Sequence, residues 1–441
     1  MKEDITRKYL DLFARSEREI TTHSPDLLNK YRSEAIKELE NDGLPRYRNE
    51  DYQRFKIDQE IDQDRSQHQV QKDSNLNLAP FSCRLTYPDT IQCFIIEGKV
   101  FTPNKGDNFF IGSISEFEET YPGIAEKYYN KILHEDNDRI SSLNTLFATD
   151  ALVYYIPKGV KQSKPIHLIH YPNSEVENEN SPLSFPRILW IAEEDSKSSL
   201  LLCDHATKDQ STYIGVMEVY AEKNAELQYY NIEETSTDSL RIFNTHIHQN
   251  ENSTVLVDNM TIKNGKTRNN FYCNLHGKDA HLDLDGLGIL DDEQLLDNWS
   301  IIRHHVPSCH SDELFKYTIN DKAVGSFSGL IYVAPDAQKT LAYQNNKNLI
   351  LADSAKMYSK PQLEIYADDV KCSHGMTTGE LNESAIFYMQ QRGIPYVEAK
   401  LLLTIAFMSD VLDKIDVEPL RDRLYTVIEN RYRGLPGRCS K

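Results

Sequence analysis

The stretch "DDVKCSHGM" (369–377) carries the two residues whose types and spacing are best suited to chemistry, Cys372 and His374. It follows the strand-like run "PQLEIYA" and precedes a helical pattern. Residues i and i+2 of an extended chain point to the same side, so this thiol and imidazole are expected to project together. Metal ions bind both groups, and a thiolate is also the reactive form of cysteine in sulfur chemistry. Two ligands are too few for a closed site, so the pair is either half of a metal or sulfur site or a structural cysteine beside a surface histidine.

Two further pairs of residues have the composition of a catalytic or metal site. In "HLDLDG" (281–286), Asp283 and Asp285 lie on one face of a predicted strand. Paired carboxylates perform acid and base catalysis in some polysaccharide-cleaving β-solenoid enzymes, but aspartates are also common on solvated strand faces. In "PSCHSDELFKY", Cys309 and His310 are adjacent, so on a strand they face opposite ways and share a ligand site only at a turn.

One incomplete motif argues against a bound nucleotide, and the absence of another argues against a closed zinc site. "NGKT" (264–267) resembles the end of a phosphate-binding loop, but Met260 occupies the position of the required first glycine. The pattern therefore predicts a hairpin turn at Asn264-Gly265 and no ATP bound by this chain. No C-x-x-C pair occurs among the seven cysteines, so the sequence predicts no closed structural zinc site and a chain that folds without metal.

Composition and charge exclude several functional classes. The 441 residues include 49 basic and 68 acidic ones, and the net charge of −19 disfavours binding to nucleic acid or to an anionic membrane. The start "MKEDITRKYLDLF" lacks the apolar core of a signal peptide, and the longest apolar run, "LLLTIAFM", is too short to cross a membrane. Seven scattered cysteines are typical of reduced thiols. We therefore expect a soluble, cytoplasmic protein.

Residues 1–80 are predicted to form an N-terminal helical domain that ends in a polar linker. Apolar residues recur at helical spacing from Tyr9 onward, and "SPDLLNKYRSEAIKELENDG" combines a Ser-Pro start with an apolar stripe and a stop at Gly43. The following "DQEIDQDRSQHQVQKDSN" (58–75) has almost nothing to bury, so we interpret it as a linker or a long surface loop.

Residues 81–374 have the pattern of a β-solenoid. Short apolar-alternating runs such as "TIQCFIIEGKVF", "IGVMEVYAE" and "TVLVDNMTI" are separated by turn residues, and no convincing helix occurs between residues 80 and 370. Turn-like Asn, Asp or Ser residues recur at positions 224, 252, 279, 336 and 354, with spacings of 28 and 27 but also 18. Stacked coils that each bury one face against the next explain this weak repeat, so we expect a solenoid or large barrel rather than a small sandwich.

Residues 375–441 return to a helical pattern. "LNESAIFYMQQRGI" begins at a predicted N-cap, Asn382, and ends at Gly393. Its centre, "IFYM", is unusually apolar for a first helix. The helix either packs on its own domain or presents a face to a partner protein.

Three longer stretches carry a resemblance to a known family. They are "KPQLEIYADDVKCSHGMTTGELNESAIFYMQQRGI" (360–394), "GSFSGLIYVAPDAQKTLAYQNNKNLIL" (325–351) and "GLPRYRNEDYQRFKID" (43–58). Together they resemble the SufB/SufD family of the SUF iron–sulfur cluster assembly system. The similarity is dense from about residue 300 to 395 and thin from 85 to 290, and Tyr52 stands where the family often has Trp. "KCSHG" resembles the SufD branch, because the SufB paralogue carries a different sequence there.

The resemblance implies a mainly β fold with helical ends, in which a right-handed parallel β-helix core is flanked by N-terminal and C-terminal helical domains. It also implies a scaffold subunit rather than an enzyme. In this family SufD pairs with SufB through the β-helices, and each binds a SufC ATPase through its C-terminal helices. A transient iron–sulfur cluster is built at the SufB–SufD interface. In isolation the chain could form a homodimer.

The resemblance also assigns roles to individual residues. It implies that His374 is the cluster-proximal ligand of this chain, that Cys372 lies beside it, and that SufB supplies the remaining ligands, a cysteine among them. The partner-binding helix contains Ile386, Phe387, Tyr388 and Arg392. The alternative function is a β-helix carbohydrate-active enzyme that uses Asp283 and Asp285, although such enzymes are usually exported with a signal peptide.

Overall fold

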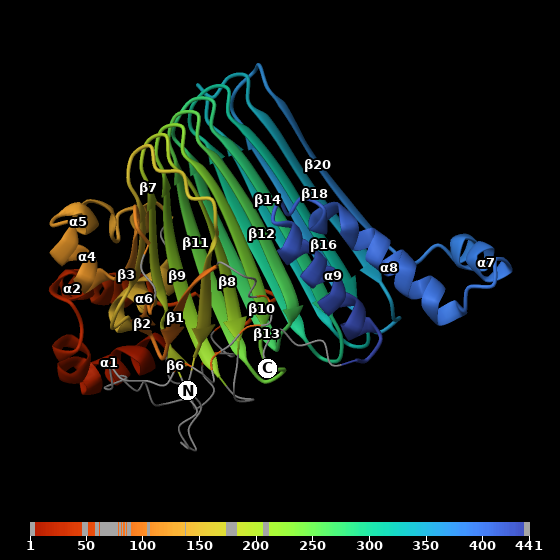
Figure 1. Ribbon diagram of the computed structural model, residues 1–441, viewed down its shortest axis with the longest axis horizontal. Helices are drawn as coiled ribbons and strands as arrows, with labels where there is room; N and C mark the ends of the chain where they lie inside the picture. Colours follow the sequence, from red (N-terminus) through yellow and green to blue (C-terminus); the bar gives the residue numbers. More distant parts are fainter. Residues whose placement is uncertain are drawn as a thin grey trace.

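The protein is an elongated stack of β-strands with helices at both ends (Figure 1). The computed structural model describes residues 5–45, 52–57, 61, 78, 81, 83, 85, 90–103, 106–136, 138–172, 183–205 and 211–435. Apart from Ile61, the predicted linker at 58–75 lies outside the described residues.

The strands form two 10-stranded sheets. The first sheet contains β1 (Ile91–Ile96), β2 (Lys99–Phe101), β5 (Ile166–Tyr171), β8 (Lys197–His205), β10 (Glu226–Glu234), β12 (Thr254–Lys263), β14 (His281–Leu290), β16 (His310–Ile319), β18 (Leu341–Ile350) and β20 (Lys371–Gly379). The second contains β3 (Phe110–Ser113), β4 (Leu152–Ile156), β6 (Leu183–Ser184), β7 (Arg187–Ala192), β9 (Thr212–Ala221), β11 (Leu240–Gln249), β13 (Lys266–Leu275), β15 (Leu295–His304), β17 (Val324–Val333) and β19 (Lys356–Ile365).

The way these strands are connected confirms the predicted fold class. From β7 onward, successive strands alternate between the two sheets. Among the described strands every pairing is parallel except β1 with β2 and β3 with β4. The middle of the chain is therefore a parallel β-helix, in which each coil pairs with the coils before and after it.

The weak repeat in the sequence comes from turns that lead from the second sheet to the first. Asn224, Asn252 and Asp279 have φ values of 58°, 56° and 61°, a left-handed conformation that Asn and Asp tolerate better than most residues. The turns stack, and the side-chain amide of Asn252 donates to Oδ1 of Asn224 over 2.8 Å. Ser308 continues the column, whereas Ser354 lies in a turn of the opposite kind, between β18 and β19. Mixing the two kinds of turn produces the irregular spacing of 18.

The predicted hairpin at Asn264-Gly265 is wrong. This turn joins β12 to β13, which belong to different sheets, and each of these strands pairs in parallel with strands of neighbouring coils. Glycine is required here because a Cβ on Gly265 would lie 2.5 Å from the carbonyl oxygen of Ser239 in the preceding coil. Asn-Gly marks a tight turn in either case, so the sequence did not distinguish a corner of the β-helix from a hairpin.

The expectation that no helix occurs between residues 80 and 370 is also wrong. Four short helices interrupt the first coils: α4 (Ile114–Thr120), α5 (Ile124–Tyr128), η2 (Ile132–Glu135) and α6 (Arg139–Phe147). Asp138 caps α6 by accepting hydrogen bonds from the backbone N–H groups of Ile140 and Ser141. Every residue of α6 from Ile140 to Phe147 is buried. Its apolar residues recur at helical spacing between buried serine, asparagine and threonine residues, but the helix has only 9 residues, which is a short stretch for recognition by periodicity.

Helices cover the N-terminal coils and one outer face of the β-helix. The N-terminal helices α1 (Ile5–Thr22) and α2 (Asp26–Asp42) pack with α6 beside the first coils (Figure 1). The C-terminal helices are α7 (Glu383–Gln391), α8 (Tyr396–Leu412) and α9 (Glu418–Tyr432).

The second half of α8 and all of α9 lie on the outer face of the first sheet. Leu287 of β14 packs there with Met408 of α8 and Leu424 of α9, and burial of each such side chain contributes about 1.5–3 kcal/mol. Lys316 of β16 fastens α8 to the sheet, since its Nζ donates to the backbone oxygen of Phe407 and to Asp410, over 2.6 and 2.5 Å. α7 and the start of α8 instead project from the body of the protein (Figure 1).

The division of the chain into 1–80, 81–374 and 375–441 stays a prediction. The last strand, β20, continues to Gly379, and the predicted N-cap Asn382 then accepts a hydrogen bond from the backbone N–H of Ala385. The β-helix and the first C-terminal helix are thus separated by only a short connection.

Candidate functional site

The β-helix ends in two strands whose outer edges have no partner among the described residues. β20 pairs only with β18, and β19 pairs only with β17. The side chains of both strands are exposed or only partly buried, whereas those of β16 and β17 are mostly buried. An edge of this length presents unpaired N–H and C=O groups, and proteins normally cover such edges. This open end is therefore a suitable surface for a second β-structure.

Cys372 and His374 lie on the row of β20 side chains that faces the interior of the β-helix. In the register with β18, Cys372 lies opposite Ala342, and His374 lies opposite Gln344. Ala342 and Gln344 are buried interior residues. The i, i+2 spacing therefore places the thiol and the imidazole on one face, as the sequence indicates. Cys372 packs against the interior core and burial raises its pKa, whereas His374 is exposed at the open end.

A buried polar row continues from His374 into the interior. Gln344 donates its side-chain N–H to Oε2 of Glu313 over 2.6 Å. Burial raises the pKa of Glu313 to about 7, against the opposing effect of hydrogen bonds from Ser300 and Gln344. Oε1 of Gln344 has no hydrogen-bond partner among the described residues. We did not predict Gln344 or Glu313. The sequence did carry one indication of them, because each is a polar residue at a strand position where apolar residues are expected.

We expect the substitution Glu313→Gln to stabilise the protein at high pH only. The pKa of Glu313 is about 7 in the folded chain and 4.5 ordinarily, so the unfolded chain releases this proton at a lower pH. Stability is therefore lost as the pH rises from 4.5 through 7, and a glutamine removes that loss. The gain near pH 8 is at most about 3 kcal/mol, with little change near pH 5. Thermal melting at both pH values measures it, and an equal shift at both would contradict this account.

The structure does not bring Asp283 and Asp285 together in an open catalytic groove. Both lie on the outer face of β14, beneath the C-terminal helices. Asp285 forms a 2.9 Å ion pair with Lys414, and burial raises its pKa to about 7 although Lys414 opposes this. Asp283 forms a 3.2 Å ion pair with His281. Asp285 thus pairs with the C-terminal helices as a buried support.

Cys309 and His310 face opposite ways, as the sequence predicts. Cys309 lies in the interior core, where its thiol donates to the backbone oxygen of Gly277 over 3.3 Å. His310 lies on the outer face, and its ring centroid is 4.5 Å from that of His281. The two residues do not form a shared ligand site.

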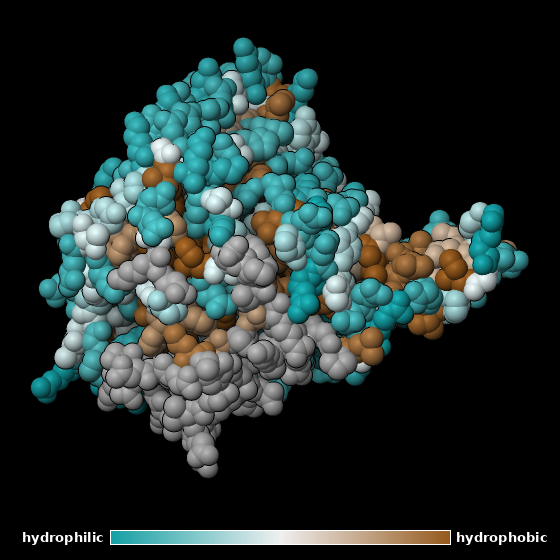
Figure 2. Space-filling view, in the orientation of Figure 1, coloured by the Kyte–Doolittle hydropathy of each residue, from teal (hydrophilic) through white to brown (hydrophobic). Residues whose placement is uncertain are grey.

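The projecting arm, which we define as α7 and the first half of α8, exposes large apolar side chains. Phe387 and Tyr388 are 62% and 59% exposed, whereas Ile386 is buried within the arm at 1%. Arg392 donates to the hydroxyl of Tyr388 over 2.9 Å and lies over its ring. Figure 2 shows apolar residues gathered along this arm, while polar residues predominate over the upper part of the body.

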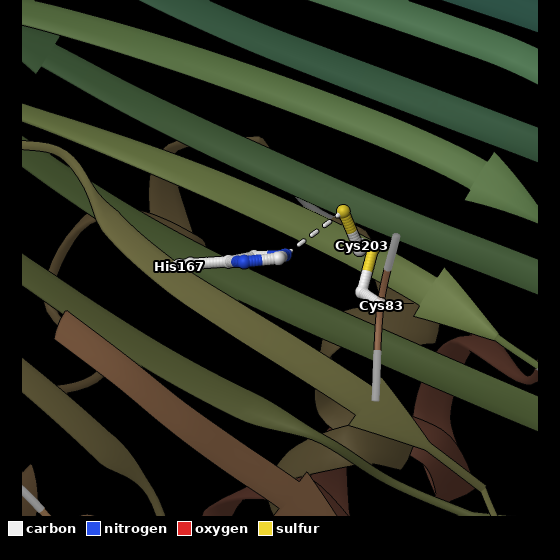
Figure 3. A group of neighbouring side chains, drawn as sticks. All are labelled: Cys83, His167 and Cys203. Carbon is white, nitrogen blue, oxygen red and sulfur yellow. Dashed lines mark hydrogen bonds between the residues drawn. The ribbon is translucent and has the colours of Figure 1, made fainter. Parts of the chain in front are cut away.

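A buried cluster of Cys83, His167 and Cys203 is a second group of candidate ligands that we did not predict (Figure 3). Nε2 of His167 is 3.3 Å from the sulfur of Cys203. Burial alone would raise the pKa of the Cys83 thiol, but interactions with Cys203, His167 and His205 lower it well below its ordinary value. The three residues are far apart in the sequence, so no motif of short spacing indicates the cluster.

No helix among the described residues is both long enough and apolar enough to span a membrane. This agrees with the short apolar runs seen in the sequence.

Two family models match most of the chain. The model described as "SUF system FeS cluster assembly, SufBD core domain" matches residues 175–407, and the one described as "SufBD protein N-terminal region" matches residues 3–168. The first match includes β20 with Cys372 and His374, and also the projecting arm.

Three curated proteins are similar to the chain over most of its length. An iron-sulfur cluster assembly SufBD family protein of Synechocystis is 29% identical over 67% of each chain. Protein ABCI7, chloroplastic, of Arabidopsis thaliana is 30% identical over 71% of this chain and 68% of its own. Iron-sulfur cluster assembly protein SufD of Escherichia coli is 28% identical over 63% of this chain and 66% of its own.

Proposed function

The chain belongs to the SufBD family of the SUF iron–sulfur cluster assembly system, and we propose that it is a scaffold subunit that pairs with SufB and docks a SufC ATPase. The observation that carries this proposal is the open end of the β-helix, where one exposed imidazole stands on an unpaired edge strand. An uncovered edge of this kind is suited to pairing with the β-helix of another chain.

The nascent cluster is the cargo of this site, and this chain supplies only part of its ligands. His374 offers an imidazole nitrogen to iron, and Cys372 offers a thiol two residues away on the same face. Its raised pKa makes the Cys372 thiolate less available, so His374 is the primary ligand and Cys372 an accessory one. The partner at the edge contributes the missing ligands, including a cysteine.

Gln344 positions the imidazole of His374 in this proposal. The two residues are opposite one another in neighbouring coils, and Oε1 of Gln344 is buried without a hydrogen-bond partner among the described residues. In this proposal the imidazole turns inward when the cluster is built and donates a ring N–H to that oxygen, which leaves the other ring nitrogen free for iron. Such a contact fixes the tautomer and orientation of a histidine ligand.

The projecting arm is the docking element for SufC. Phe387 and Tyr388 are large, exposed and adjacent, and aromatic anchors of this kind commonly dominate the binding energy of an interface. Arg392 holds the ring of Tyr388 in place through its hydrogen bond. ATP hydrolysis then belongs to SufC, and this chain has no catalytic turnover of its own.

Co-expression of the tagged chain with SufB and SufC from the same organism tests the proposal. We expect affinity purification to recover all three proteins, and the chain expressed alone to pair with a second copy through the same open end. A carbohydrate-active enzyme is expected to purify alone. Recovery of the chain without SufB and SufC, when both are present and soluble, would contradict the scaffold role.

A further inference from the structure

The cluster of Cys83, His167 and Cys203 has the geometry of a metal site. His167 comes from β5 and Cys203 from β8, on the outer face of the first sheet, and Cys83 reaches them from the segment that precedes β1 (Figure 3). Their candidate ligand atoms all lie within 4.8 Å of one another. All three residues are buried.

The ligand types and spacing fit a tetrahedral zinc ion. Zinc binds sulfur at about 2.3 Å and imidazole nitrogen at about 2.0–2.1 Å, so neighbouring ligand atoms in a tetrahedron are about 3.6–3.8 Å apart. The 3.3 Å between Nε2 of His167 and the sulfur of Cys203 is close to this value, and the remaining distances among the three residues are at most 4.8 Å. The three side chains are thus already gathered at nearly the spacing that a zinc ion needs.

A fourth ligand is available on the same strand face. His205 is two residues beyond Cys203 on β8, and it lies beside Cys83. Its side chain is buried, its Nδ1 lies 3.9 Å from a carboxylate oxygen of Glu234, and neither ring nitrogen makes a hydrogen bond of good geometry within the described residues. A buried imidazole whose hydrogen bonding is incomplete costs free energy, and coordination of a metal ion removes that cost.

We propose that Cys83, His167, Cys203 and His205 bind one structural zinc ion. This proposal replaces the expectation from the sequence that the chain folds without metal, and it does not depend on the proposed function. The site is distinct from the cluster site at the open end. Six strand spacings separate β8 from β20 in the first sheet, which is about 29 Å at roughly 4.8 Å per spacing.

The zinc ion would bind Cys83 to the outer face of the first sheet. Phe81 and Leu85 flank Cys83 and are buried against the same outer face, and the ring of Phe81 is 5.0 Å from that of Tyr171 on β5. This segment lies between the N-terminal helices and the first strand of the β-helix. A metal bond there links the two parts of the protein and adds its binding free energy to folding.

Metal analysis of the full-length purified chain tests the proposal. We expect about one zinc per chain after dialysis in zinc-containing buffer, and near zero for the variant Cys203→Ser. The matched control is Cys93→Ser, because Cys93 lies on the neighbouring strand β1 but faces the interior core. It should keep its zinc. Equal zinc in the wild-type chain and in Cys203→Ser would overturn the proposal.

Cobalt substitution and X-ray absorption keep the test decisive if Cys203→Ser fails to fold. The wild-type chain loaded with Co²⁺ should show thiolate-to-cobalt charge transfer and the visible bands of a tetrahedral ion. The zinc edge of the wild-type chain should report two sulfur and two nitrogen ligands. Absence of sulfur from the coordination shell, or iron bound to these residues in preference to zinc, would overturn the assignment.

Discussion

Replacing His374 by alanine is expected to remove most of the iron and sulfide from the assembled complex while the chain stays folded and paired. His374 is exposed at the end of the β-helix and packs against no core cluster, so its loss leaves no cavity. The nascent cluster, however, loses its ligand from this chain. Changes to a group that merely supports a ligand already cost about 10–100-fold in metal affinity, so we expect a loss of at least tenfold.

Matched variants separate a ligand from a structural residue. Cys372→Ala should lower iron and sulfide loading less than His374→Ala, because its thiol is partly buried and its pKa is raised. Gln344→Leu should preserve pairing but weaken loading if it orients the imidazole, whereas His310→Ala, on the outer face, should have no effect. Iron and sulfide are measured in each purified complex. Full loading in the His374→Ala complex would mean that His374 is only a surface histidine.

The pattern of apolar residues and turns was sufficient to predict the β-helix, because its coils repeat a local rule. Each corner needs a residue that tolerates positive φ, and Asn224 and Asn252 provide it at nearly constant spacing. Cys372 and His374 lie on the same face of their strand, and this also follows from a local rule, the two-residue period of a strand. Features that depend on one strand and its nearest neighbours in sequence could therefore be predicted.

Features that depend on contact between segments far apart in the sequence could not be predicted. Cys83, His167 and Cys203 meet only because parallel pairing places β5 beside β8 and lays the preceding segment over both. Helix α6 was missed for a different reason, because its helical spacing of apolar residues extends over only 9 residues. The ion pair of Asp285 with Lys414 likewise depends on where the C-terminal helices fold back, which no period in either segment encodes.

The Phe387→Ala substitution is expected to weaken the binding of SufC strongly without unfolding the chain. The Phe387 side chain is 62% exposed on the projecting arm, so its truncation removes little packing within this chain. An aromatic residue in the centre of an interface typically contributes at least about 2 kcal/mol, which corresponds to a dissociation constant about thirtyfold higher. Titration of the purified variant with SufC, by calorimetry or interferometry, measures this change. SufB pairing at the open end should be unaffected, since that edge lies on β19 and β20.

Two control variants show whether the loss arises from the interface or from the fold. Leu435 is also a large exposed apolar residue, at 52%, but it follows α9 and lies outside the arm, so Leu435→Ala should leave SufC binding unchanged. Ile386 is buried beside Phe387, so Ile386→Ala should lower the melting temperature by opening a cavity, at a cost of about 2–5 kcal/mol if the arm unfolds with the rest of the protein. If Phe387→Ala and Leu435→Ala bind SufC equally well, the arm is not the docking element. If instead Phe387→Ala melts like Ile386→Ala, the aromatic side chain supports the arm rather than contacting the ATPase.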